Sequence, residues 1–344
     1  MKKSLFMLGV AVAALSSCSQ SEILEVAEGR AIGFSSFVNN NTRAVTEVTK
    51  DNLSQYYVFG NYGSDGASDW SGQAFNNELN TTLYYWQPGM TYRFGAYADG
   101  NGGKIESSGE GATVSFDAAT QKLTFTNYTP DDAKDLVAAV TENQTANDHS
   151  NKKNDPVQLN FKHLLSQVKL TFTSTAAATY KLTISDVRIE GAVSTCTGEY
   201  TTTTGVTWNT DGSTTKNGYV YDFFGTEGKE ISSGVSQYQS KLVIPQSGTE
   251  QLYVYFTATI KGEKPSGSTI STKDFKATLK HAVADVDVDA NAWEPSYCYN
   301  YIANVEIKDI VDNEDDLVEI KFEVTGVEEW KPVEAGTVIN EVKE

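Results

Sequence analysis

Short runs of β-branched and aromatic residues, broken by clusters of turn-forming residues, restrict this chain to strands over most of its length. The runs alternate with a period of two, so that Val168, Leu170 and Phe172 share one face, and the pattern recurs over 252–260 and 317–324. One face of such a strand is buried and the other is solvated. The pattern therefore predicts an all-β fold built from antiparallel β-sandwiches.

With 344 residues, the chain is long enough for more than one hydrophobic core. Segment 143–156 carries almost no apolar side chain to bury, which is typical of a linker or a long exposed loop. We therefore predict an N-terminal β-sandwich over 44–155 and a larger C-terminal β-sandwich over 156–330.

Residues 1–18 have the pattern of an export signal. Lys2 and Lys3 precede an uncharged run over 5–15, which is too short to cross about 30 Å of hydrocarbon as a helix. Small residues then close on Cys18, as in a bacterial lipobox, where the cysteine is acylated. The alternative is an ordinary secretory leader that contains Cys18 by chance. Both interpretations predict that the chain leaves the cytoplasm.

The net charge of −18 at pH 7 argues against nucleic acid and anionic lipid as partners. No later apolar run approaches the length of a membrane span, so lipid on Cys18 is the expected membrane attachment. The other two cysteines are Cys196 and Cys298. A disulfide between them and a pair of free thiols are both open alternatives outside the cell.

No pattern of catalytic or metal-binding residues stands out. An EF-hand loop beginning in the run 285–289 would need Gly and Glu where Ala290 and Ser296 stand. A Gly-x-Ser-x-Gly elbow is absent. The histidines lie far apart, without His, Cys or Asp partners at a metal-ligand spacing: His149, His163 and His281. We therefore predict no enzymatic activity, no metal and no cofactor.

Four tryptophans have rings of the kind that stack on sugars: Trp70, Trp86, Trp208 and Trp293. In a sandwich, such residues more often fill the core or form cross-strand pairs. These rings support an alternative function, an unprocessed monomeric surface lipoprotein that binds glycans.

The two ends of the chain carry further strand-like segments. Segment 31–38 predicts a strand, and Arg43 follows it in a polar stretch that predicts an exposed, protease-accessible loop. An ordinary loop arginine is the alternative. At the far end, 337–342 is strand-like and lies beyond a break at Pro332. It predicts either an edge strand of its own sheet or an unpaired strand available for β-strand addition.

Taken together, these features resemble the fimbrillin family, the Mfa-like and FimA-like pilins of Bacteroidetes. The resemblance covers nearly the whole chain and depends on the order and spacing of several short motifs. These are Cys18, 34–44 ending in Thr-Arg-Ala, 84–86 with Pro88-Gly89 and 92–94, 161–168, 242–246, and Trp293 followed by 299–301.

The resemblance implies two tandem transthyretin-like antiparallel β-sandwich domains and export as an outer-membrane lipoprotein. It also implies that an arginine-specific protease cuts between Arg43 and Ala44. This cut would release a propeptide, 19–43, with the first strand and its inward residues Ile32, Phe34 and Val38. Cleavage after Arg30 is an open alternative, and it would leave the first strand in place.

The resemblance further implies a partner, the next pilin subunit, joined head to tail in a cell-surface fimbrium used for adhesion. Its C-terminal segment, 331–344, would fill the groove vacated by the first strand. The residues of this donor strand would be Thr337, Val338, Ile339, Asn340 and Val342. Whether the subunit stands in the shaft, at the tip or at the anchor stays open, as does the surface that the fimbrium touches.

Overall fold

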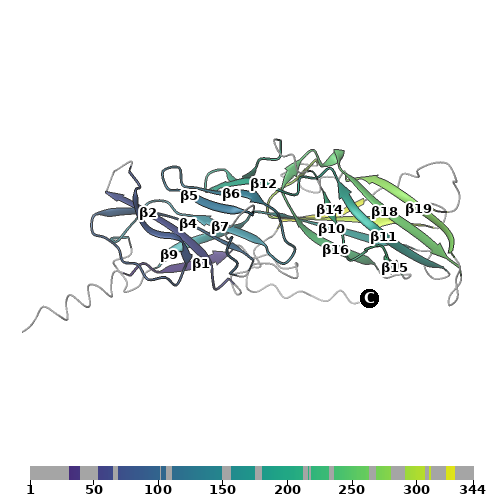
Figure 1. Cartoon of the computed structure of the whole chain (residues 1–344), viewed down its shortest axis with the longest axis horizontal. Coiled ribbons are helices and arrows are strands. Elements are labelled where there is room, and N and C mark those ends of the chain that lie inside the picture. The colour runs from purple at the N-terminus through teal and green to yellow at the C-terminus, as the bar shows by residue number, and fades with distance from the viewer. Residues whose placement is uncertain are drawn as a thin grey trace, which may run out of the picture.

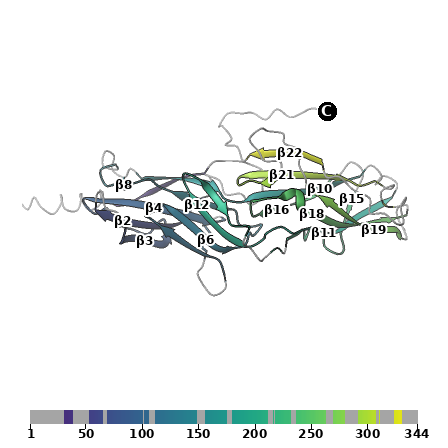
Figure 2. The same cartoon turned by 90° about the horizontal axis from the view of Figure 1, so that it is seen from above.

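The structure is a computed structural model of the whole chain. It describes residues 31–38, 53–64, 69–100, 102–105, 111–148, 156–174, 180–211, 216, 218–231, 236–262, 269–279, 291–306, 310 and 323–329. Strands make up nearly all the regular structure of these residues, which confirms the predicted all-β class. They form two sandwiches that lie end to end in an elongated molecule (Figures 1 and 2).

The first sandwich contains the largest sheet, whose strand order is β1-β9-β7-β4-β2-β3, with β8 paired to β4. Its strands are β1 Phe34–Val38, β2 Tyr57–Ser64, β3 Gly72–Leu79, β4 Met90–Asp99, β7 Leu136–Val140, β8 Gln144–Thr145 and β9 Val157–His163. The second sheet has the order β13-β12-β6-β5. Its strands are β5 Thr113–Asp117, β6 Lys122–Tyr128, β12 Cys196–Thr201 and β13 Gly205–Trp208.

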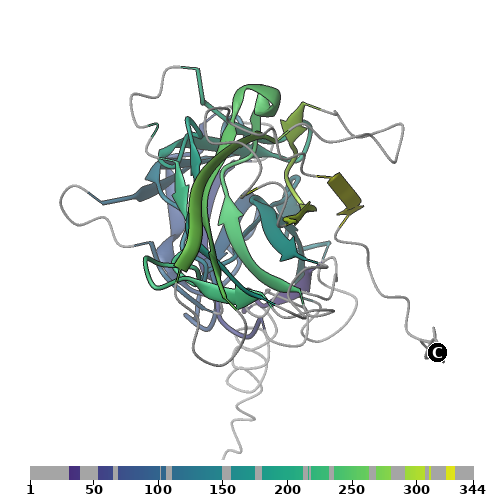
Figure 3. The same ribbon diagram turned by 90° about the vertical axis from the view of Figure 1, so that its right-hand side faces the viewer.

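The second sandwich has two sheets, ordered β16-β10-β21-β22 and β14-β11-β18-β19, with β15 paired to β11. The strands are β10 Ser166–Thr173, β11 Lys181–Glu190, β14 Tyr219–Val220, β15 Lys229–Ile231, β16 Gln237–Val243, β18 Tyr253–Lys261, β19 Thr269–Thr278, β21 Tyr297–Asn304 and β22 Glu323–Glu329. A small sheet pairs β17 Gln246–Ser247 with β20 Ala292–Trp293, and a 3-10 helix, η2, covers Thr249–Gln251. Viewed along the long axis, the second sandwich lies in front of the first (Figure 3).

Alternating burial accounts for the core of the second sandwich. In β18, the side chains of Val254, Phe256, Ala258 and Ile260 are buried, whereas those between them are half-buried. This confirms the alternation predicted over 252–260. Of the strand predicted over 317–324, only the last two residues are described, and they begin β22.

The chain crosses between the sandwiches after β9, after β11 and after β13. The strand pairing therefore does not follow the boundary predicted at residue 156, because β9, β12 and β13 complete the sheets of the first sandwich. The polar segment 143–156 contains β8 and is followed by β9 of the same sheet. The polarity of this segment carries no information about which sheet the next strand joins.

Contacts between the sandwiches accompany these crossings. Asp132, from the first sandwich, accepts a hydrogen bond from the backbone N–H of Leu242 at 3.1 Å. The same carboxylate pairs with Nζ of Lys241 at 2.7 Å. Trp208 donates from Nε1 to the carbonyl of Leu164, which lies at the first crossing, at 2.9 Å. Polar groups at the junction thus fix the ends of both sandwiches to each other.

Candidate functional site

The strand β1 is the candidate functional element, because it lies at the edge of the largest sheet and fills part of the core. It pairs in parallel with β9, with Phe34 opposite Val157 and Val38 opposite Phe161. The other described pairings within this sheet are antiparallel. A parallel edge strand that comes from far upstream in the sequence is a separate addition to an otherwise antiparallel sheet.

The residues just before β1 bond to a different part of the sandwich. Ala31 forms an antiparallel bridge with Tyr85, and the N–H of Ile32 donates to the carbonyl of Tyr84 at 2.8 Å. Segment 31–38 therefore lies between β9 on one side and segment 84–85 on the other. It thus contributes backbone bonds to two separate parts of the first sandwich.

The inward side of this segment is apolar. Ile32 and Val38 are buried, and Phe34 packs against the same core cluster. The ring of Phe34 lies 5.3 Å from the rings of both Phe75 and Phe94, in edge-to-face geometry. These rings belong to β3 and β4, so the sheet curls until its first and last strands share one core.

Further aromatic rings line the space behind Phe34. The ring of Trp86 lies 4.8 Å from that of Tyr92 and 6.0 Å from that of Phe94. Gly60 permits this packing, because a Cβ atom there would lie 2.9 Å from the Phe94 ring. The segment 31–38 therefore covers a close-packed aromatic cluster, and its removal would expose these rings to solvent.

The outward side of β1 is different in character. The side chain of Phe37 is 45% exposed, whereas that of Val38, next to it, is fully buried. This contrast follows from the period of two, since successive side chains point to opposite faces. It separates residues that fill the core from residues that do not.

Of the predicted site residues, the structure brings together Ile32, Phe34 and Val38 in one core cluster. The others lie outside the described residues: Cys18, Arg30, Arg43, Ala44, Thr337, Val338, Ile339, Asn340 and Val342. The last described strand is β22, which is an edge strand of the second sandwich and ends shortly before Pro332. Strand displacement, cleavage and donation by the tail remain predictions.

Sequence reasoning missed the two walls of the site, which are β9 and segment 84–86. The aromatic run at 84–86 was the available signal, but nothing in a local pattern says which distant strand it contacts. The parallel pairing of β1 with β9 was missed for the same reason.

The histidines and cysteines considered as candidate site residues have contacts typical of structural side chains. Nδ1 of His163 lies 2.7 Å from Oδ2 of Asp135 in a buried pair, while His149 and His281 fall outside the described residues. Cys196 and Cys298 are free thiols, and burial raises the pKa of the Cys196 thiol to about 11. This argues for the alternative of two free thiols.

Of the four tryptophans considered as sugar-stacking candidates, three are buried, namely Trp86, Trp208 and Trp293. Trp70 is partly exposed, and the guanidinium of Arg93 lies 4.2 Å from its ring centroid. Within the described ranges, no group of three or more His, Cys, Asp or Glu side chains could hold a metal ion. In the same part of the chain, no helix is both long and apolar enough to cross a membrane.

Comparison with known proteins identifies the family. The family model for fimbrillin-like proteins matches residues 25–330, which is most of the chain. The chain belongs to the fimbrillin-like family. The family assignment makes it a structural protein with a role in fimbriae or adhesion, not an enzyme. No curated protein sequence matches the chain.

Solved structures agree with this fimbrillin-like fold. A fimbrial protein from Bacteroides vulgatus is 17% identical, with a TM-score of 0.55 over 88% of this chain and 100% of that one. A candidate cell adhesion protein from Parabacteroides distasonis is 11% identical, with a TM-score of 0.50 over 90% and 99% of the two chains. At such identities, the similarity shows the fold alone.

Proposed function

We propose that this fimbrillin-like protein is a pilin subunit that polymerises by exchanging its first strand for the tail of another copy. The observation that carries the proposal is the position of β1, an edge strand whose inward side chains complete the core. Arg43 lies five residues beyond Val38. Cleavage after Arg43 would therefore detach the whole segment 31–38 from the rest of the chain.

Loss of this segment would be costly for an isolated subunit. Each large apolar side chain removed from the core withdraws about 1.5–3 kcal/mol of burial. The outer backbone groups of β9 and segment 84–85 would also lose their partners, and an unpaired buried group costs about 1–3 kcal/mol. An incoming strand would restore both contributions, which favours assembly over a stable open monomer.

The tail of the chain has the residue pattern needed to replace β1. Inward positions of β1 read Phe34, Ser36 and Val38, which is apolar, small polar, apolar. The alternate tail residues Val338, Asn340 and Val342 repeat this order. Starting the tail one position later would place Glu341 at an inward position. We therefore assign Val338, Asn340 and Val342 to the inward face of the donor.

Groove and donor lie at opposite ends of the sequence, so the contact is head-to-tail and builds an open filament. On this proposal, lipid on Cys18 holds the precursor at the outer membrane until an arginine-specific protease releases it. The released subunit then joins a surface fimbrium. Adhesion to a host or bacterial surface follows from exposure of the fimbrium.

Two arginine variants test the maturation step. Cells expressing Arg43→Ala should accumulate monomeric, lipid-bearing precursor, whereas Arg30→Ala should assemble normally with Ala44 as the mature N-terminus. The measurements are N-terminal sequencing and gel analysis of protein sheared from cell surfaces. Unaltered filaments from Arg43→Ala, or filaments whose subunits begin at Ala31, would refute cleavage-driven exchange.

A further inference from the structure

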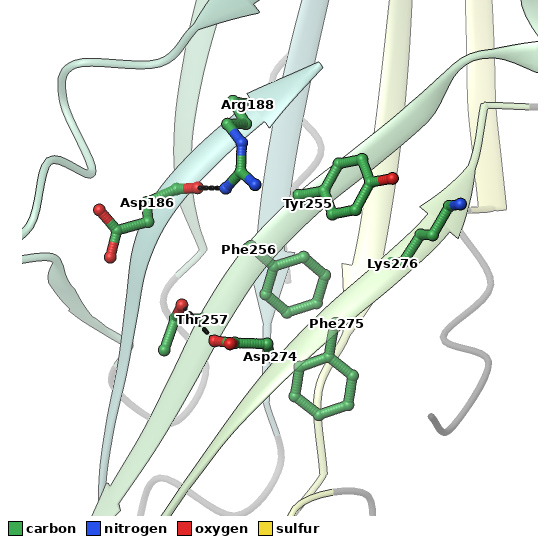
Figure 4. Close-up of a pocket in the computed structure, with 8 residues that line it drawn as sticks. All are labelled: Asp186, Arg188, Tyr255, Phe256, Thr257, Asp274, Phe275 and Lys276. Carbon is green, nitrogen blue, oxygen red and sulfur yellow. Dashed lines mark hydrogen bonds between the residues drawn. The ribbon is translucent and has the colours of Figure 1, made fainter. Parts of the chain in front are cut away.

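The solvent-facing side of the second sandwich contains a polar hollow that the strand-exchange proposal does not use. It lies over β11, β18 and β19 and has a volume of about 460 Å3 (Figure 4). This volume falls within the range of about 300–1000 Å3 that is usual for small-molecule sites. The exposed or partly exposed side chains around it are Asp186, Arg188, Tyr255, Thr257, Asp274 and Lys276.

Strand register assembles one wall of the hollow. Tyr255 pairs with Arg188 on β11 and with Lys276 on β19, so the three side chains form a row across the sheet. The guanidinium carbon of Arg188 lies 4.9 Å from the Tyr255 ring centroid, and Nζ of Lys276 lies 5.5 Å from it. Arg188 also pairs through Nε with Glu190 at 2.6 Å, and Nζ of Lys276 lies nearer to the Tyr253 ring, at 3.7 Å. Each cation has further N–H groups that can serve as donors beside Tyr255.

Two carboxylates complete the hollow in the next row. Asp274 accepts a hydrogen bond from Oγ1 of Thr257 at 2.7 Å, which fixes one carboxylate oxygen (Figure 4). Asp186 lies in a β-bulge between Ser185 and Arg188 and has a left-handed φ of 52°. The bulge brings Asp186 to the solvent side, where a regular strand would bury that position.

The side chains that line the hollow carry two positive charges, on Arg188 and Lys276, and two negative charges, on Asp186 and Asp274, and Glu190 beside it pairs with Nε of Arg188 at 2.6 Å. An anionic ligand would meet these carboxylates and a chain whose net charge is −18. An apolar peptide would find one aromatic ring and no deep apolar pocket, because Phe256 and Phe275 are buried in the core beneath the sheet. A neutral ligand rich in hydroxyl groups matches this mixture of donors, acceptors and one ring.

We propose that this hollow binds a neutral saccharide. Hydroxyl groups of the sugar donate to the carboxylates of Asp186 and Asp274 and accept from Arg188 and Lys276, since a hydroxyl group does both. The C–H groups of the sugar ring pack against Tyr255. This assigns glycan recognition to the sheet surface and not to the four candidate tryptophans, three of which are buried.

Single-site binding is weak, with a Kd of about 1 mM or more, because the hollow is open and encloses the ligand on one side only. If the proposed polymerisation holds, each subunit repeats the site along the filament, and simultaneous contacts raise the overall avidity. The site itself does not depend on polymerisation. Its test can therefore use the unpolymerised chain.

The test is saturation-transfer difference NMR on the purified Arg43→Ala chain. The probes are the methyl glycosides of glucose, galactose, mannose and N-acetylglucosamine, with lactose, and sialic acid serves as the anionic comparison. We expect signals from at least one neutral sugar, with its ring C–H protons the most strongly saturated. Tyr255→Ala and Asp274→Asn should each weaken that sugar's binding at least tenfold.

The matched control is Tyr238→Ala. Tyr238 is also an exposed tyrosine next to a lysine, with Lys169 Nζ 4.0 Å from its ring centroid, but it lies on β16 of the other sheet. This variant should bind like the parent chain. Absence of signals for every neutral sugar, binding of sialic acid alone, or unchanged binding by Tyr255→Ala and Asp274→Asn would each overturn the proposal without bearing on strand exchange.

Discussion

The rings of Phe34 and Phe75 lie 5.3 Å apart, although their strands, β1 and β3, are the two ends of the largest sheet in hydrogen-bond order. This contact means that the sheet curls around its own core and that the first strand closes the curl. The strand therefore contributes to stability through its inward side chains.

The precursor should depend on Phe34 and not on Phe37. Phe34→Ala removes a half-buried ring from the aromatic cluster and should lower the free energy of unfolding by about 2–3 kcal/mol. Phe37→Ala changes an exposed ring on the same strand and should cost less than about 1 kcal/mol. Urea titration of the uncleaved Arg43→Ala chain measures both. Equal losses would contradict the assigned faces of β1.

Both residues lie in the segment that the proposal removes. Once cleavage after Arg43 has occurred, filaments grown from Phe34→Ala and from the parent chain should dissociate at the same temperature. A filament that retains the destabilisation would show that the first strand stays in place.

The donor tail should tolerate charge on one face only. Val338→Asp and Val342→Asp place a carboxylate in the apolar groove, where an unpaired charge is strongly disfavoured, and should reduce polymer at least tenfold. Ile339→Asp changes the position of Ser35, which is half-buried on the other face of the strand, and should reduce assembly much less than either valine substitution. Polymer yield on native gels after cleavage measures these effects. Loss of assembly in Ile339→Asp alone would reverse the assigned register.

Stability should respond to pH through Asp99. Burial raises the pKa of this carboxyl above its ordinary value of 3.8, although a hydrogen bond from Tyr128, at 2.8 Å, lowers it. Because the pKa of Asp99 is higher in the folded state than in the unfolded chain, its protonated carboxyl stabilises the fold. This contribution to the free energy of unfolding is complete below about pH 3.8 and is lost as the pH rises through the folded-state pKa. Asn cannot ionise but still accepts the Tyr128 hydrogen bond.

Asp99→Asn should therefore gain stability relative to the parent chain between about pH 3 and pH 7. Urea unfolding at both pH values, on the same uncleaved background, gives the difference. If Asp99→Asn instead lost stability relative to the parent chain toward neutral pH, the fold would favour the ionised carboxylate. That result would contradict the raised pKa of Asp99.

The local alternation of apolar and polar residues was enough to predict strands, but not which strands pair with one another. The alternation over 252–260 is seen directly in β18, whereas in β10 the predicted inward residues Val168, Leu170 and Phe172 are buried and Thr171 between them is buried too. The pairing of β1 with β9 joins residues more than 100 positions apart, and the return of β12 and β13 to the first sandwich follows two strands of the second. Neither arrangement has a local signal, and a polar connection at 143–156 was therefore interpreted as a domain boundary.

The candidate sites differ in the same way. Ile32, Phe34 and Val38 were recognisable because the alternation of one strand places them on one face. The hollow in the second sandwich was not, because Arg188, Tyr255 and Lys276 meet only through the register of three strands and a bulge.

The most direct test of strand exchange is a disulfide between subunits. In the register of β1, Ile339 of the donor replaces Ser35, which lies opposite Gln158 on β9. Paired strands place such residues within the usual Cα separation of a disulfide, about 4.4–6.8 Å. Filaments of chains with Gln158→Cys and Ile339→Cys should therefore run as a covalent ladder on a non-reducing gel. In the control variant, Gln158→Cys with Asn340→Cys, the second cysteine lies on the opposite face of the donor strand. Filaments of this control should run as monomers. Filaments of the first variant that run only as monomers with free thiols would contradict the account.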